Sequence, residues 1–340
     1  MELIPVRPSH NSIQTVQVQG NKSVSLEYLF DNLDFLFVWK TVMLKYHLRG
    51  KSYDPVAIFK ALLLKEIRQI SSKRKLAMFL RKNEVWLRKC GFEEPPHHDT
   101  FSKFIDRVGA DSFEEIFDQL VKRIGEARNI GRVIAIDSTL IKAYSRSYKN
   151  SEPSDPDAKW GYDPNNEGWV FGYKLHIAVD AELELPLVFT VTPANVYDSV
   201  EYPNIIQKLL NKGIKPEIVI MDAGYDSKKN YLITLAEDII PIIALNPRNM
   251  KYQEKRDFEE MLPIQRDSKF WSQLYKKRGA VERVISRLKE ELTLKAVRVR
   301  GMGNVKVHIA LSLIAMLTVA LAAFNTKSGH LSKSVNSFRF

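Results

Sequence analysis

Three carboxylates stand where the sequence could build a metal site. Asp137 follows the apolar run VIAI, Asp222 follows the apolar run IVIM, and Glu282 lies in an amphipathic segment. In sheets whose strands are connected by crossover helices, ligands bind where the strands end. Two strand-end aspartates and a helix glutamate could therefore hold two divalent ions. Each aspartate alone is more simply explained as a turn or cap. Their joint placement before Glu282 favours a pair of ions that promotes in-line displacement at a phosphodiester.

The glutamate belongs to segment 275–292, YKKRGAVERVISRLKEEL, whose apolar residues recur at helical spacing. At about 100° per residue, Arg278, Glu282 and Lys289 fall within roughly 60° of Tyr275, on a stripe that borders the apolar face. A carboxylate flanked by two cations and a phenol suits a metal site that handles phosphate. Solvated charges on an ordinary surface helix are the alternative explanation.

Basic residues outnumber acids, with 51 Lys and Arg against 40 Asp and Glu, a net charge of +11 and a pI near 9.4. The excess is concentrated in 60–92 and 270–308, which is typical of a nucleic-acid binder, although solvated helix faces would look the same. Lys174 neighbours His176 on a predicted strand, where a DNA contact and a packed histidine are both possible. The candidate DNA-contacting residues outside the stripe are Lys73, Arg74, Lys174, Arg298 and Arg300.

The pattern changes from helical to β-rich near Gly131. Residues 1–24 are polar and expected to be disordered, 25–130 form a helical region resembling helix-turn-helix DNA-binding domains, and 326–340 form a tail. Segment 26–48 is predicted as one helix. In 131–325 we expect strands that end at Asp137 and Asp222, a strand pair over 169–193, and helices between. The predicted fold class is therefore α/β, with a mixed sheet flanked by helices.

One segment, Val307 to Phe324, imitates a membrane span. It is short against the roughly 20 residues that a span needs and contains His308, Ser312 and Thr318, so a buried C-terminal helix is the better interpretation. The start, MELIPVRP, lacks the pattern of a signal peptide. The single cysteine, Cys90, excludes an internal disulfide and a zinc ribbon. These features predict a soluble, cytoplasmic protein without a membrane partner.

The spacing of Tyr275, Arg278, Glu282 and Lys289 matches the YREK pattern of insertion-sequence DDE transposases from bacteria and archaea. AIDST resembles the motif around that family's first aspartate, and MDAGYDS resembles its second. GYKLHIAVD and TPANVYDS look like the intervening strands and turn, and the basic region 55–110 resembles the family's N-terminal domain. The resemblance covers about 55–325.

This resemblance implies an RNase H-like catalytic domain in 131–325, with Asp137, Asp222 and Glu282 as ligands of two Mg²⁺ ions that Mn²⁺ can replace. It implies binding to terminal inverted repeats, DNA cleavage, and strand transfer into target DNA. Tyr275, Arg278 and Lys289 would hold DNA near the metals. The resemblance also places an inserted β structure near 240–272. A homodimer on DNA, associated with the nucleoid, is expected because an element has two ends.

Two other functions remain open on these residues. A nuclease of the same fold would cut DNA without joining it, and a regulator or end-binding remnant would bind DNA without catalysis. His97, His98 and Asp99 form a further candidate metal group, but a turn that opens a helix is the simpler explanation.

Overall fold

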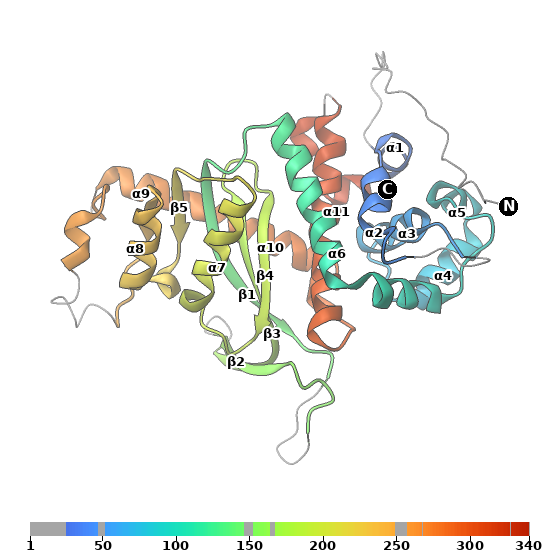
Figure 1. Cartoon of the computed structure of the whole chain (residues 1–340), viewed down its shortest axis with the longest axis horizontal. Helices are drawn as coiled ribbons and strands as arrows, with labels where there is room; N and C mark the ends of the chain where they lie inside the picture. Colours follow the sequence, from blue (N-terminus) through green and yellow to red (C-terminus); the bar gives the residue numbers. More distant parts are fainter. Residues whose placement is uncertain are drawn as a thin grey trace.

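A helical region precedes a β-rich region, as the sequence pattern predicts (Figure 1). The computed structural model describes residues 25–46, 52–145, 152–163, 167–248, 257–266, 268–326 and 328–339. The predicted disorder of 1–24 therefore concerns residues outside the described ranges. The first region consists of helices α1 (Leu26–Asn32), α2 (Leu36–Val42), α3 (Pro55–Ile67), α4 (Lys73–Lys82), α5 (Glu84–Cys90) and α6 (His98–Ala127).

The single helix expected over 26–48 is wrong. The chain leaves the helical conformation at Leu33, and the Asp34 carboxylate accepts a hydrogen bond from the Leu36 amide at 2.8 Å, which starts α2 afresh. A short acidic side chain that bonds its own backbone competes with helix continuation. Further along, α6 kinks at Gly109, whose φ of 76° is open to glycine but strained for other residues.

The β-rich region is built on one mixed sheet. Strand β1 (Val133–Lys142) pairs antiparallel with β3 (Gly168–Asp180) on one side and parallel with β5 (Ile218–Met221) on the other. Beyond them, β4 (Pro186–Pro193) and β2 (Lys159–Asp163) pair antiparallel with β3, and β6 (Ile240–Ile243) pairs parallel with β5. This confirms the expected strand pair β3–β4 and a mixed α/β sheet.

Helices cover the sheet and link it to the helical region. In Figure 1, α7 (Asp198–Asn211) crosses in front of the sheet and α10 (Gly279–Glu290) passes behind it. Helix α10 contacts β1 and β3, whereas α7 contacts β3 and β4. Helix α8 (Lys228–Ala236) packs on β6, and α9 (Lys269–Tyr275) precedes α10. Helix α10 is therefore the element that brings Glu282 against the strand that bears Asp137.

The apolar C-terminal segment is the core helix that the sequence predicts. Helix α11 (Met302–Phe324) is long and apolar enough to span a membrane, yet 89% of its most apolar window is buried inside the protein. It packs on α6, α3 and β4, and so joins the helical region to the sheet (Figure 1). Burial against protein satisfies its hydrophobicity without lipid.

The span 240–272, where a β insertion is expected, is described only in part. It opens with β6, and a 3-10 helix (Asp257–Met261) and the first residues of α9 follow. In the described part of this span β6 is the only strand, and 249–256 and 267 lie outside the described residues. The β insertion therefore stays a prediction.

Candidate active site

Parallel pairing of β1 with β5 brings the first two acids together. Ile136 is in register with Met221, so Asp137 and Asp222, the next residues on each strand, leave the paired segment at the same point. Asp137 continues along β1, where its Oδ1 accepts the Ser138 amide at 2.7 Å. Asp222 caps a short 3-10 helix (Ala223–Tyr225), and its Oδ1 accepts the Gly224 amide at 2.9 Å. The predicted strand end is present at Asp222 but not at Asp137, because β1 runs on to Lys142. What ends before both aspartates is the parallel pairing of β1 with β5.

Both aspartates are held in surroundings that disfavour their charge. Burial and the neighbouring carboxylate of Asp222 raise the pKa of Asp137 to about 7. Burial, with the charge of Asp198, also raises the pKa of Asp222, against the opposing effect of the Gly224 hydrogen bond. A bound cation would relieve the repulsion between the two carboxylates. With both aspartates ionised, the metal-bound site is therefore favoured over the metal-free site.

Arg278 links the first and third acids. Its Nη1 lies 3.1 Å from Oδ2 of Asp137, and its Nη2 forms a hydrogen-bonded ion pair with Oε1 of Glu282. The guanidinium is mostly buried, with 22% of the side chain exposed, whereas the Glu282 side chain is 54% exposed. The single charge of the arginine therefore offsets only part of the negative charge of the two acids in the metal-free protein, and Glu282 has room to turn.

The segment 275–292, predicted as one helix, is a 3-10 turn followed by the α-helix α10. Helix α9 ends at Tyr275, a 3-10 turn carries Lys276–Arg278, and α10 begins at Gly279 with the backbone right-handed throughout. Trp271 stacks on the Tyr275 ring at 4.8 Å, and the Arg278 guanidinium lies 5.8 Å from the same ring. The turn thus keeps Tyr275, Arg278 and Glu282 together, as the helical spacing predicts.

Lys289, the last member of the stripe, lies in a different place. It lines a cleft of about 510 Å³ between the helical region and the segment after α10. Lys73, Arg74 and Arg298, all candidate DNA contacts, line the same cleft. Arg300 does not; its guanidinium lies 5.4 Å from the Tyr144 ring. The structure therefore separates an acidic site from a basic cleft, and both are bounded by α10.

Comparisons with known proteins agree with this geometry. A family model described as "Transposase DDE domain" matches residues 128–318, more than half of the chain. The chain belongs to this transposase family. A second model, "Transposase domain (DUF772)", matches residues 12–107. The resemblance to insertion-sequence DDE transposases is confirmed.

Curated relatives support the same assignment. The protein named "Probable transposase for insertion sequence element ISH11", found in two strains of Halobacterium salinarum, is 25% identical over 283 residues, covering 81% of this chain and 82% of the relative. Among solved structures, a piggyBac synaptic complex with hairpin DNA matches at TM-score 0.45 and 12% identity, covering 90% of this chain and 75% of that one. A Drosophila P element strand transfer complex matches at 0.33 and 12%, covering 86% and 66%. Scores this low add nothing to the fold argument.

The residues of the transposase fit a divalent cation of the Mg²⁺ type. The donors are carboxylate oxygens, which hard cations prefer. Gly224 lets two carboxylates lie close to its backbone: a Cβ built there would lie 3.0 Å from Oδ1 of Asp222 and 3.4 Å from Oδ2 of Asp198. Tyr225 is fully buried, and its Oη has no hydrogen-bond partner among the described residues. Buried polar atoms are normally satisfied, so the protein's described atoms leave this hydroxyl short of a partner.

Asp198 of the transposase is a residue that sequence reasoning placed only in a motif and at the start of a helix. It is the first residue of α7, and its Oδ1 accepts hydrogen bonds from Ser138 at 2.7 Å and Lys174 at 3.1 Å. Its charge raises the pKa of Asp137 and Asp222, after the effect of burial. An acid in the first turn of a helix is too common to be noticed in sequence.

The environment of Lys174 differs from that of an ordinary surface lysine. Its ammonium donates to the Val196 carbonyl at 2.8 Å and to Asp198, and 14% of the side chain is exposed. The DNA contact expected for Lys174 stays a prediction. His176 is packed: its side chain is fully buried, and its Nε2 is hydrogen-bonded with Thr192 Oγ1 at 2.9 Å. Burial lowers the pKa of His176 to about 4, so the ring is neutral near pH 7.

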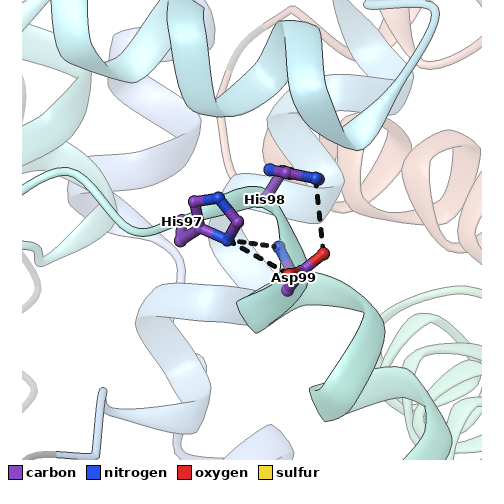
Figure 2. A group of neighbouring side chains, drawn as sticks. All are labelled: His97, His98 and Asp99. Carbon is purple, nitrogen blue, oxygen red and sulfur yellow. Dashed lines mark hydrogen bonds and ion pairs between the residues drawn. The ribbon is translucent and has the colours of Figure 1, made fainter.

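Among the described residues, only His97, His98 and Asp99 form a group of three whose ligand atoms all lie within 4.8 Å of one another (Figure 2). His97 caps α6, and its Nδ1 accepts the Asp99 amide at 3.4 Å. The helix-opening turn is thus confirmed. Asp137, Asp222 and Glu282 do not form such a group, and Arg278 is ion-paired with both Asp137 and Glu282.

Proposed function

We propose that this transposase binds the terminal inverted repeats of an insertion sequence, cleaves the DNA by metal-dependent phosphodiester hydrolysis, and joins the ends to target DNA. The observation that carries the proposal is the placement of Asp137 beside Asp222 where the β1–β5 pairing ends, with Arg278 bridging Asp137 to Glu282 of α10. The mixed sheet supports an RNase H-like catalytic domain over 131–325, with 326–340 as a tail.

Two Mg²⁺ ions, which Mn²⁺ can replace, are the proposed cofactors, with Asp137, Asp222 and Glu282 as ligands. When bound, the ions activate the attacking oxygen and stabilise the leaving oxygen of the phosphodiester. The chain's own residues align them: β1 and β5 fix the two aspartates, and α10 carries the glutamate. Arg278 and Tyr275 lie beside the acids and are placed to hold a DNA phosphate there.

The basic cleft is the proposed path of DNA between the two regions. Lys73, Arg74, Lys289 and Arg298 line it, and phosphate contacts by such side chains provide most sequence-independent affinity. Residues 25–130 would form the DNA-binding domain, with α3, α4 and α5 as its helix-turn-helix-like part. A homodimer on DNA, in the cytoplasm and on the nucleoid, completes the proposal. An active complex with a single protomer on paired ends, by light scattering, would contradict the dimer.

The experiment is a cleavage and strand-transfer assay with Mg²⁺ on DNA that carries the ends flanking the gene. Wild type should cut and join, whereas Asp137→Ala, Asp222→Ala and Glu282→Ala should bind the ends and do neither. EDTA should abolish both steps in wild type. Cutting without joining would identify a nuclease, and binding alone would identify a regulator or remnant. Full activity in any of the three variants would show that the triad is misassigned.

A Gly224→Ala substitution tests the close packing of Gly224 against the carboxylates of Asp222 and Asp198 without changing charge. The added methyl would press on Oδ1 of Asp222 at 3.0 Å, and the residue's φ lies outside the positive region, so the backbone tolerates alanine. Since a displacement of about 1 Å in a reacting group can cost about 10²-fold, we expect cleavage to slow to that order.

Gly329→Ala is the matched control for Gly224→Ala, because the built Cβ at Gly329 meets only a Phe324 carbon at 4.0 Å. Equal cleavage rates for the two variants would show that the close packing at Gly224 does not matter for cleavage. Initial rates on end DNA at saturating Mg²⁺ measure the effect.

Arg298→Ala tests the cleft as a DNA path. Arg298 is exposed at its rim, so its loss should weaken binding to all sequences alike and reduce the slope of log K against log salt by about 1. Fluorescence anisotropy with end DNA from low to moderate salt measures the slope. Arg132→Ala, which removes an exposed arginine paired with Glu217 before β1, should leave the slope unchanged. Equal slopes for all three proteins would remove Arg298 from the DNA path.

A further inference from the structure

Asp198 begins helix α7 beside the proposed metal-binding acids, but its carboxylate does not cap the helix. The N-cap of α7 is Tyr197, and no side chain makes a capping hydrogen bond there. The Asp198 carboxylate turns to the sheet instead, where Ser138, directly after Asp137, donates to its Oδ1 at 2.7 Å. The side chain is only 23% exposed. Strand residues, and not its own helix, therefore fix the position of this partly buried carboxylate, which points to a role other than helix capping.

One oxygen of Asp198 is occupied and the other is available. Oδ1 takes the hydrogen bonds of Ser138 and Lys174, whereas no described residue donates a hydrogen bond to Oδ2. Oδ2 lies close to Gly224, since a Cβ built there would be 3.4 Å from it and 3.0 Å from Oδ1 of Asp222. Carboxylate oxygens from two different elements thus lie against the same glycine, with no side chain of that residue between them.

Two residues next to these carboxylates have buried polar atoms without a hydrogen-bond partner among the described residues. His176 is fully buried, and its Nδ1, 3.6 Å from Oδ1 of Asp198, has no hydrogen-bond partner among the described residues. Tyr225, next to Gly224, is also fully buried with an unpartnered Oη. Native proteins rarely leave buried polar atoms unpaired, so the protein atoms alone do not complete this site.

We propose that Asp198 supplies a fourth carboxylate to the divalent-metal site, on the Asp222 side. This inference rests on the proposed function, since it adds a ligand to the same metal centre. Lys174 and Ser138 hold Oδ1, and Oδ2 lies on the side of Gly224 and Asp222, while Glu282 lies on α10, which packs on β1 and β3. Carboxylate oxygens from four elements would then surround the ions, in keeping with the six or more oxygen ligands of hard cations.

The test is Mn²⁺ binding to the metal-free full-length protein, followed by electron paramagnetic resonance and calorimetry. Asp198→Asn keeps an oxygen acceptor for Ser138 and Lys174 and removes the charge. We expect it to weaken Mn²⁺ binding at least about tenfold. The matched control is Glu201→Gln, in the same first turn of α7, whose carboxylate pairs with Asn204. It should change the affinity less than twofold. Unchanged affinity in Asp198→Asn, or an equal loss in Glu201→Gln, would overturn the proposal.

Two further variants separate this proposal from the proposed function. Asp137→Asn and Asp222→Asn should each weaken Mn²⁺ binding. If they do and Asp198→Asn does not, Asp198 is no ligand and the metal centre stands. If neither does, the metal centre itself is wrong. Should Asp198→Asn fail to fold, as judged by its melting curve without metal, Gly224→Ala places a methyl group against the carboxylates of Asp222 and Asp198 instead. Unweakened Mn²⁺ binding in that variant would overturn the proposal.

Discussion

The Asp137→Asn substitution is expected to make the metal-free transposase more stable while abolishing its activity. Burial and Asp222 raise the pKa of Asp137 to about 7 from the ordinary value of 3.8. The ionised form is therefore penalised in the folded state, so wild type loses stability as pH rises from about 4 through 7. Asn removes that penalty and should add roughly 2–4 kcal/mol at pH 8, the upper figure corresponding to the full shift.

The gain should shrink steadily on acidification and vanish near pH 4, where Asp137 is protonated in wild type too. Urea unfolding of metal-free protein across pH 4–8 measures it. Asp111→Asn, on the exposed surface of α6, is the matched control and should change stability by less than about 0.5 kcal/mol. Equal stability of Asp137→Asn and wild type at pH 8 would show that Arg278 already neutralises the acids.

The activity of Asp137→Asn should fall about 10³-fold, because losing a metal ligand removes several kcal/mol of transition-state stabilisation and about 1.4 kcal/mol is a factor of ten. Cleavage of end DNA under single-turnover conditions measures this fall. If the repulsion between Asp137 and Asp222 is retained because the metal site needs both charges, the variant should be more stable and inactive. A variant both stabilised and active would remove Asp137 from the catalytic machinery.

Lys65→Met is expected to destabilise the fold by about 3–5 kcal/mol, because it leaves a charge buried without its partner. Lys65 Nζ lies 2.7 Å from Oε1 of Glu66, whose side chain is fully buried between the helical region and the segment after α10. Thr293 also donates to Glu66. Burial alone would favour protonation, but Lys65, His308 and these hydrogen bonds outweigh it and keep the pKa of Glu66 below its usual range.

The control is the double variant Lys65→Met, Glu66→Gln, which removes both charges and should recover much of the lost stability. Since Glu66 loses its main partner in the single variant, its pKa should rise, and acidification should restore part of the stability of that variant alone. Unfolding by urea at pH 8 and pH 5 measures both effects. Equal stability of the single and double variants would show that Lys65 is not what compensates the buried charge.

The local pattern of the sequence determined the elements that carry the chemistry. The apolar runs before Asp137 and Asp222, rich in the β-branched residues Val and Ile and short for a helix, favour strands. Helical spacing placed Tyr275, Arg278 and Glu282 on one side, and a change of helix type at Arg278 did not disturb it because the backbone remained right-handed. These features depend on neighbours within about one or two turns of chain, which the sequence contains.

Tertiary structure alone decided which charges meet. Arg278 reaches Asp137 from 141 positions away, and Lys289, on the same stripe as Glu282, faces a cleft instead of the acids. Asp198 is drawn to the site because Ser138 and Lys174 lie on paired strands. The break before α2 depends on one side chain bonding a nearby amide. Such contacts follow from how strands pair and helices pack at long range, and residue order does not fix that geometry by itself.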